Sequence, residues 1–431
     1  MIIYTIKPGD SVYSIARRYG LSEERIIAEN ELRNPAELVV GQTLVLSQPT
    51  AVYTVAQGDT VYNIASRFGI TPNQLWRNNP QLGGKGELVP GQELVISLPA
   101  PTLGSIDVGG YAYPNIDRDV LRKTLPYLTY LTLFTYGIRD DGTLIGIEDE
   151  ELIELARSYG VAPIMLVSTL TEEGTFSNEL AADLLSDPAM QARLIADIAR
   201  TLTEKRYAGV DIDFEYVPSE FAAAYVQFIE ALHAALSPNG YKVFVALAPK
   251  TSATQPGLLY EGHDYAGLGN AADAALLMTY EWGYTYGPPM PVAPINRVRE
   301  VVDYALSVIP SEKLILGIPN YGYDWRLPYV AGESKAQSLS NVAAVDLALQ
   351  RHAAIDFDQT AQSPYFRYFV RENGEPIEHV VHFEDARSIN AKLRLIAEKH
   401  LRGGNVWNIM RYFPQLWLVL NNLFSINRVM E

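Results

Sequence analysis

The chain has 431 residues, with 34 Lys+Arg against 50 Asp+Glu, so its formal net charge is −16. This acidic balance argues against nucleic-acid and anionic-membrane partners, because phosphate groups are bound chiefly by clustered Lys and Arg. Cysteine is absent, which excludes disulfides, thiolate-held zinc and a thiol nucleophile. The length predicts about three domains. The N-terminus lacks the basic and apolar regions of a signal peptide, so we expect none.

The first hundred residues contain a repeat. The segment 4–20 returns as 53–69, and the segment 39–45 returns as 89–95. Each copy predicts the order strand, helix, helix, strand, with a Gly-Asp-Ser or Gly-Asp-Thr turn capping the first helix. Asn30 and Asn79 are expected to close the second helix of each copy.

The two copies resemble LysM modules, over residues 2–46 and 51–97. The resemblance implies binding of glycans that contain N-acetylglucosamine, such as peptidoglycan or chitin. The sugar would lie between the first strand–helix loop and the loop before the last strand. An alternative role for the two aspartates is helix capping alone. The residues implied for glycan binding are Gly9, Asp10, Ser11, Val12, Gly58, Asp59, Thr60 and Val61.

Beyond a Pro-containing linker at 97–104, short apolar runs alternate with helical patterns. Eight strands with intervening helices predict an α/β fold, a (β/α)8 TIM barrel over 104–431. The last interval is too long for one crossover, so 323–385 is expected to be a small α+β insertion after strand seven. Its aromatic residues suit either a groove wall or a packed core. The expected strands begin near Ser105, Thr129, Ala162, Ala208, Val243, Ala274, Leu314 and Gly403.

The segment Val210-Asp-Ile-Asp-Phe-Glu215 carries the sharpest chemical signal. Side chains alternate along a strand, so Asp211, Asp213 and Glu215 share one face. In a barrel strand covered on both sides, such a cluster should keep at least one carboxyl protonated, which suits proton donation to a leaving group. From these six residues alone, an acidic surface strand or a divalent-metal site remains open.

The segment resembles the strand-four signature of family 18 glycoside hydrolases, Asp-x-x-Asp-x-Asp-x-Glu, with Ala208 in place of the first Asp. Met278-Thr-Tyr-Glu-Trp-Gly283 resembles the strand-six motif, with Glu281 where Asp is usual. Gly403-Gly-Asn-Val-Trp407 resembles the last strand. For Tyr280 and Trp407 taken singly, a packing role is the alternative.

The resemblance implies substrate-assisted hydrolysis with retention of configuration. Glu215 would be the acid and base, Asp213 would orient the acetamido nitrogen, Asp211 would tune Asp213, and Tyr280 would hold the acetamido oxygen. No cofactor and no metal are implied. His263 is expected to be a loop or supporting residue without a catalytic role. Further residues expected to bind substrate are Trp407, Met278, Glu281, Trp282 and Tyr111.

Two LysM-like modules before this barrel resemble spore cortical fragment-lytic and germination glycosylases of the SleL/YaaH type. That resemblance implies a β-N-acetylglucosaminidase of cortex peptidoglycan, located in the spore coat and cortex region or otherwise at the cell wall. We expect the enzyme to be of the endo type and a monomer. A chitinase and a non-catalytic glycan-binding protein remain alternatives. Residues 1–100 hold 8 basic and 9 acidic residues, so the modules should hold sugar by shape and hydrogen bonds.

Overall fold

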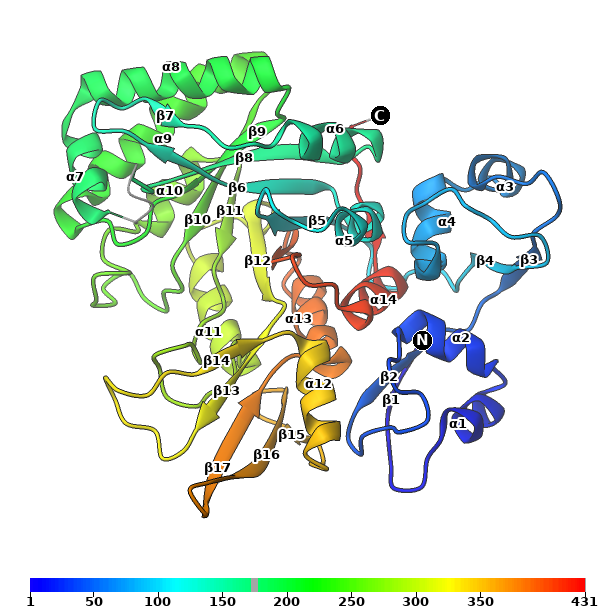
Figure 1. Cartoon of the computed structure of the whole chain (residues 1–431). Helices are drawn as coiled ribbons and strands as arrows, with labels where there is room; N and C mark the ends of the chain where they lie inside the picture. Colours follow the sequence, from blue (N-terminus) through cyan, green and yellow to red (C-terminus); the bar gives the residue numbers. More distant parts are fainter. Residues whose placement is uncertain (172–176, 431) are drawn as a thin grey trace.

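The computed structural model describes residues 1–171 and 177–430. The two N-terminal repeats lie along one side of a barrel, and an additional sheet extends from the same barrel (Figure 1). Helix α14 (Pro414–Leu423) packs against elements of both repeats. No helix in these described ranges has both the length and the apolar character needed to cross a membrane.

Each repeat folds as a two-stranded antiparallel sheet with two helices between its strands, as the sequence predicts. Val12, Ile15 and Ala16 of the first repeat, at helical spacing, are buried in its core. The first repeat consists of β1 (Ile2–Thr5), α1 (Val12–Tyr19), α2 (Glu23–Asn30) and β2 (Thr43–Leu46). The second consists of β3 (Ala51–Thr54), α3 (Val61–Phe68), α4 (Pro72–Asn78), the short helix Pro80–Leu82 and β4 (Glu93–Ser97).

The predicted turns do cap the helices, but the alternative role of Asp10 and Asp59 as the capping residues was wrong. Ser11 and Thr60 are the N-caps, and each side chain accepts the backbone N–H three residues later. Asp10 instead accepts a hydrogen bond from the Tyr4 hydroxyl at 2.6 Å and from the Lys7 backbone N–H at 2.8 Å. Asp59 repeats this arrangement with Tyr53. Each aspartate thus fastens its turn to the first strand.

Asn30 and Asn79 join the second helix of each repeat to the last strand. The Asn30 amide donates to the Val45 carbonyl at 3.0 Å and accepts from the Val45 N–H at 2.8 Å. Asn79 makes the same pair of bonds to Val95, each 2.8 Å long. Because both amides are buried, removing either would leave backbone groups of the strand without partners.

The rest of the chain forms the predicted barrel, so the fold class is confirmed. Eight parallel strands are joined edge to edge, and pairing of the first with the second closes the sheet. They are β5 (Ser105–Ala112), β6 (Tyr130–Ile138), β8 (Ala162–Ser168), β9 (Gly209–Asp213), β10 (Lys242–Leu247), β11 (Ala274–Leu277), β12 (Leu314–Pro319) and β18 (Gly403–Trp407). Strands β7 (Leu144–Ile145) and β19 (Ser425–Ile426) add short pairings to β6 and β5.

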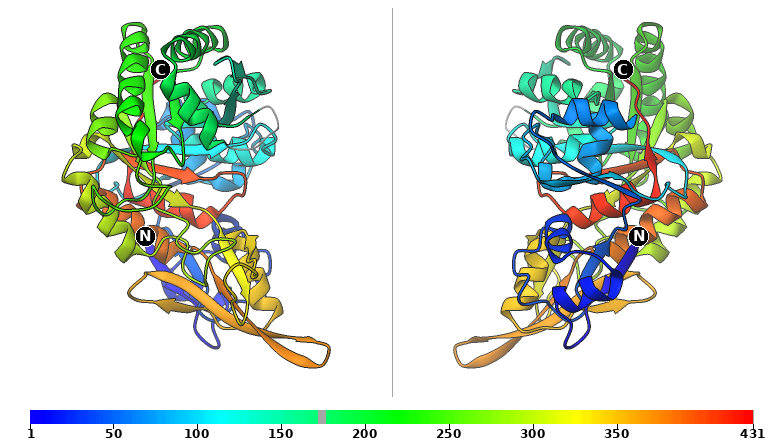
Figure 2. Two further views of the ribbon diagram at one scale, coloured as in Figure 1. Left: turned by 90° about the vertical axis from the view of Figure 1, so that its left-hand side faces the viewer. Right: turned by 90° about the vertical axis from the view of Figure 1, so that its right-hand side faces the viewer.

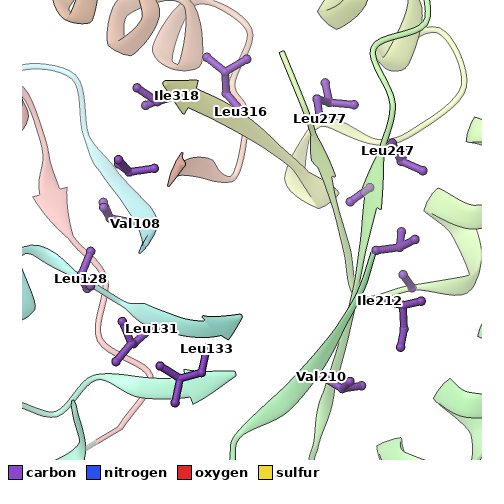
Figure 3. Close-up of a cluster of buried hydrophobic side chains, with 14 of the residues drawn as sticks. Val108, Leu128, Leu131, Leu133, Val210, Ile212, Leu247, Leu277, Leu316 and Ile318 are labelled. Atoms are coloured by element: carbon purple, nitrogen blue, oxygen red, sulfur yellow. The ribbon is translucent and has the colours of Figure 1, made fainter. Parts of the chain in front are cut away.

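Helices follow every barrel strand and cover the outside of the barrel. Val210 and Ile212 of β9 face these helices together with apolar residues of neighbouring strands (Figure 3). Asp211 points the other way, into the barrel, as the alternation of a strand requires. The helices are α5 (Arg118–Thr124), α6 (Glu150–Ser158), α7 (Asn178–Ser186), α8 (Pro188–Lys205), α9 (Ala222–Leu236), α10 (Tyr265–Ala271), α11 (Ile295–Leu306), α13 (Ala386–Glu398) and α14.

An antiparallel sheet follows strand seven of the barrel, as expected. Its hairpin β16–β17 projects from one end of the molecule (Figure 2). Trp325, Phe366 and Tyr368 are buried and form part of a core, whereas Tyr323 also lines a chamber beside the barrel. The elements are β13 (Gly322–Arg326), β14 (Gln337–Leu339), α12 (Asn341–Gln350), β15 (Asp356–Asp358), β16 (Ser363–Glu372) and β17 (Glu375–His382).

The first repeat is docked on this insertion and on the barrel. The Gln415 side chain receives a hydrogen bond from the Thr43 hydroxyl at 2.7 Å, and the Ile355 N–H donates to the Val40 carbonyl at 2.8 Å. The second repeat meets the barrel through Arg77, which donates to Asn421 and to the Pro126 carbonyl at 3.1 Å each. The repeats are therefore fastened to the barrel by specific bonds. The boundaries of the three domains, 2–46, 51–97 and 104–431, remain predictions from the sequence.

Candidate active site

A cavity of about 320 Å³ opens at the carboxyl ends of the barrel strands. This end of a TIM barrel is where active sites lie. The cavity brings together residues from six of the barrel strands or the loops that follow them, and nearly all the residues predicted for catalysis and substrate binding. Of these, its lining includes Tyr111, Asp213, Glu215, Met278, Tyr280, Glu281, Trp282 and Trp407.

Asp211 lies below the cavity and does not line it. Its Oδ2 accepts a 2.7 Å hydrogen bond from the Tyr111 hydroxyl, and both side chains are buried. Burial raises the pKa of Asp211 to about 6, although the Tyr111 hydrogen bond lowers it in part. Asp211 can therefore affect substrate only through its neighbours.

Asp213 and Glu215 are two acids whose environment favours the protonated form. Burial, and then the charges of Glu215 and Asp211, raise the pKa of Asp213 well above its usual value. Burial and then the charge of Glu281 raise the pKa of Glu215. Glu215 lies two residues beyond the end of β9, at the cavity wall. The carboxylate crowding expected from the sequence is thus present, and a proton donor is available at this position.

Trp407 is enclosed by aromatic rings. Its ring centroid lies 5.3 Å from that of Tyr111, 5.1 Å from Phe134 and 6.3 Å from Tyr113, all near edge-on. Tyr280 lies nearly parallel to it at 6.5 Å. These contacts hold the indole in one orientation, while part of it remains accessible from the cavity. A fixed, partly exposed indole is suited to stacking against a sugar ring.

Glu281 occupies the position where the strand-six motif has Asp, and two tyrosine hydroxyls bind its carboxylate. The hydroxyls of Tyr321 and Tyr323 both donate to its carboxylate, the second at 3.0 Å. Surrounding protein raises the pKa of Glu281, and the two tyrosine hydrogen bonds act against that rise. The longer side chain is therefore anchored from strand seven and the insertion, and it still faces the cavity.

His263 supports the peptide beside Glu215. Its Nδ1 accepts the Ala248 N–H at 2.9 Å, so the proton lies on Nε2, which donates to the Phe214 carbonyl at 2.9 Å. Burial lowers the pKa of this imidazole to about 4, so it is neutral near pH 7. His263 lies outside the cavity, and it bridges the ends of β9 and β10 as a supporting residue.

Several cavity residues were not predicted from the sequence. Tyr113 follows β5, Phe134 lies within β6, and Tyr260 lies in the loop after β10. Each resembles an ordinary core aromatic when the sequence is taken alone. The only available signal was position, because Tyr113 comes directly after one predicted barrel strand and Tyr260 lies in the segment that follows another.

The residues predicted for glycan binding in the repeats occupy equivalent places. Gly9 and Ser11, like Gly58 and Thr60, are exposed on their turns. Val12 and Val61 are buried in the module cores, so their side chains are not available to a sugar. The two sites differ in the loop before the last strand, since Val39 is 6% exposed and Val89 is 68% exposed.

Replacing Glu281 with Gln should shift the pH profile of the enzyme. Removing this negative charge lowers the pKa of Glu215, so the proton of the acid is lost at lower pH. The alkaline limb of kcat/KM should therefore move to lower pH. Glu220→Gln, an exposed change outside the cavity, is the control. An unmoved or upward-shifted limb in Glu281→Gln would contradict the coupling.

Comparisons with known proteins agree with this geometry. Residues 170–411 match the glycosyl hydrolases family 18, and residues 4–47 and 53–97 match the LysM domain. The chain is 40% identical to a cortical fragment-lytic enzyme of Bacillus subtilis (strain 168), over 99% of both chains.

Two solved structures are similar over nearly the whole chain. The spore cortex-lytic enzyme SleL of Bacillus cereus has a TM-score of 0.84 at 37% identity and covers 100% of this chain and 99% of its own. SleL of Bacillus megaterium QM B1551 has a TM-score of 0.83 at 36% identity, over 99% and 98%. The protein is therefore a glycoside hydrolase that belongs to family 18 and carries two N-terminal LysM domains.

Proposed function

We propose that this protein is a retaining β-N-acetylglucosaminidase that cleaves the glycan strands of spore cortex peptidoglycan. The observation that carries the proposal is the pairing of Glu215 with Asp213, two acids of raised pKa in an aromatic cavity at the active end of a barrel. The similarity to cortical fragment-lytic enzymes over the full chain supports the cortex as the substrate.

In the proposed reaction the substrate supplies its own nucleophile. The carbonyl oxygen of the 2-acetamido group attacks the anomeric carbon while Glu215 donates its proton to the departing glycosidic oxygen. The cyclic oxazolinium intermediate is then opened by water, whose proton returns to Glu215. Configuration is retained because the anomeric carbon is inverted twice. The raised pKa of Glu215 suits the first step, since the group must begin protonated.

The neighbouring residues would hold the acetamido group in place. Asp213 orients and stabilises its nitrogen, and the Tyr280 hydroxyl donates to its oxygen. Asp211, hydrogen-bonded by Tyr111, sets the charge beside Asp213 without contacting substrate. Trp407 forms the floor under the sugar, with Met278, Glu281 and Trp282 lining the wall.

This mechanism restricts the bond that is cut. The sugar on the non-reducing side of the scissile bond must have a free acetamido group, which N-acetylglucosamine has. A muramic δ-lactam does not, because its amide is closed into a ring. The mechanism thus excludes the lactam, and the proposed specificity for N-acetylglucosamine over N-acetylmuramic acid predicts that each cut leaves N-acetylglucosamine at the new reducing end.

Digestion of purified cortex fragments tests this function. Products are reduced with borohydride and identified by mass spectrometry, and every new end should be a reduced N-acetylglucosamine. New ends at muramic lactam would refute the assigned mechanism, and new ends at N-acetylmuramic acid, which also has a free acetamido group, would refute the assigned N-acetylglucosaminidase specificity. Absence of cleavage in cortex, with turnover of chitin oligosaccharides, would point to a chitinase instead.

The LysM modules would bind the same glycan and bring the catalytic domain to it. We place this binding at the exposed turns of Gly9–Ser11 and Gly58–Thr60, which lie on the surface of each module. A monomer in the spore coat and cortex region is consistent with the resemblance to cortex-lytic enzymes.

A further inference from the structure

A second chamber of about 350 Å³ adjoins the catalytic cavity. The two share Tyr113, Glu281 and Trp407, but neither Glu215 nor Asp213 lines the second chamber. It therefore adjoins the catalytic cavity at Trp407 and Glu281, apart from the two acids. In the proposed reaction the sugar over Trp407 is on the non-reducing side of the cleaved bond, so the chamber would receive the next unit on that side.

The walls of this chamber are polar. Besides the shared residues it is lined by Asn320, Tyr321, Tyr323, Ser338 and Asn408, and by Arg411. The Asn320 amide donates to the carbonyls of Asn408 and Arg411, at 3.0 and 2.8 Å, and so fixes the loop that carries Arg411. Such walls suit the hydroxyl and amide groups of a second sugar.

Arg411 is a basic residue at the wall of this chamber, and no acidic side chain in the described part of the chain neutralises its charge. It is exposed, and no acidic side chain of residues 1–171 or 177–430 forms an ion pair with it. A further space adjoins the chamber on the side of the first LysM module, and the other basic side chains that line it are paired. Lys123 pairs with Glu31 at 2.7 Å, and Arg33 pairs with Asp346 at 2.9 Å. An unpaired guanidinium in a chain of net charge −16 is a site for an anion on the ligand.

The chamber also continues toward the first LysM module. A third space of about 370 Å³ shares Met410 and Arg411 with it and is lined by Glu31 and Arg33 of that module. Arg411 thus stands where the two spaces meet. A glycan that leaves the catalytic cavity on this side would pass Arg411 before it reaches the module.

We propose that this chamber binds the muramyl residue next to the cleaved N-acetylglucosamine, and that Arg411 pairs with the carboxylate of its side chain. The inference rests on the proposed function, in which N-acetylglucosamine occupies the catalytic cavity and its neighbour is a muramyl unit. The lactyl group of that unit is anionic when free and neutral when closed as a δ-lactam. Arg411 would therefore make the enzyme distinguish these two forms.

Two sets of cortex oligosaccharides test this assignment. In one, the muramyl unit before the cleaved N-acetylglucosamine has a free lactyl carboxylate, after amidase removal of the peptide. In the other it is the δ-lactam. Arg411→Gln should lower kcat/KM about three- to tenfold on the acid, as expected of a partly exposed ion pair, and less than about twofold on the lactam. Arg411→Lys should restore part of the loss on the acid.

Arg394→Gln is the matched control, because Arg394 is exposed on α13, donates a 3.1 Å hydrogen bond to Asn390 and lines neither the cavity nor the chamber. It should leave both substrates unchanged. An equal loss on acid and lactam in Arg411→Gln, or no loss on either, would overturn the assignment to Arg411. If the wild-type protein cleaves neither substrate set, the proposed function fails instead, so the two failures are distinguishable.

Discussion

Glu215→Gln should lower hydrolysis of cortex fragments by about 10²–10⁴-fold, because the amide has no proton to donate to the leaving oxygen. The cavity should keep its shape, since Gln has nearly the same volume as Glu. Release of new reducing ends from purified fragments measures the rate. Binding of the inactive protein to intact cortex, measured by co-sedimentation, should match that of the wild type.

Glu220→Gln is a suitable control, since Glu220 is exposed five residues along the same loop and lies outside the cavity. It should hydrolyse fragments at the wild-type rate. If Glu215→Gln retained that rate as well, the assigned acid would be wrong. If it lost both hydrolysis and cortex binding, the substitution would have disturbed more than the catalytic step.

Gly41→Ala should separate the first LysM module from the insertion, whereas Gly91→Ala should not. The two glycines are equivalent in the repeats and have nearly the same φ, +87° and +89°. A Cβ on Gly41 would lie 1.8 Å from the Ile355 carbonyl oxygen, but one on Gly91 would meet nothing within 4 Å. The strain of a positive φ is therefore common to both variants, and the clash is confined to one.

We expect Gly41→Ala to lower the free energy of unfolding by about 1–3 kcal/mol more than Gly91→Ala, the usual cost of overpacking. Chemical denaturation of the full chain gives this difference. Limited proteolysis should also cut the connection at 47–50 faster in Gly41→Ala, because the docked module no longer protects it. Equal stability and equal cleavage of the two variants would show that the contact with Ile355 contributes nothing.

The barrel was predictable because its signals are local. Each strand is a short apolar run, and β9 begins at Gly209, one residue after the position expected from the sequence. The repeats likewise revealed their order of elements through the two copies of one pattern. The docking of Gly41 on Ile355 was not predictable, because the two residues are far apart in the chain and neither has an unusual sequence context.

In the candidate site, too, the local features were predictable from the sequence and the long-range contacts were not. Asp213 and Glu215 were apparent from their spacing, because alternation along a strand puts both on one face. The tyrosines that hold Glu281, and the imidazole of His263 that holds Phe214, come from other segments. Their roles depend on distances across the barrel, and a residue type that is common in cores gives no signal of such a role.

The attachment of the repeats affects how the two kinds of site act together. A glycan-binding module on a flexible tether samples a large volume. The glycan that it holds therefore reaches the catalytic site at a lower effective concentration than it would from a fixed module. Here the bonds through Gln415 and Arg77 fix both modules on the barrel. A strand bound by a module is then presented to the catalytic cavity at one separation and one angle. If the modules bind the glycan as proposed, they would favour cleavage of glycosidic bonds at a set distance from the bound sugars and leave the bonds closer to the module uncut.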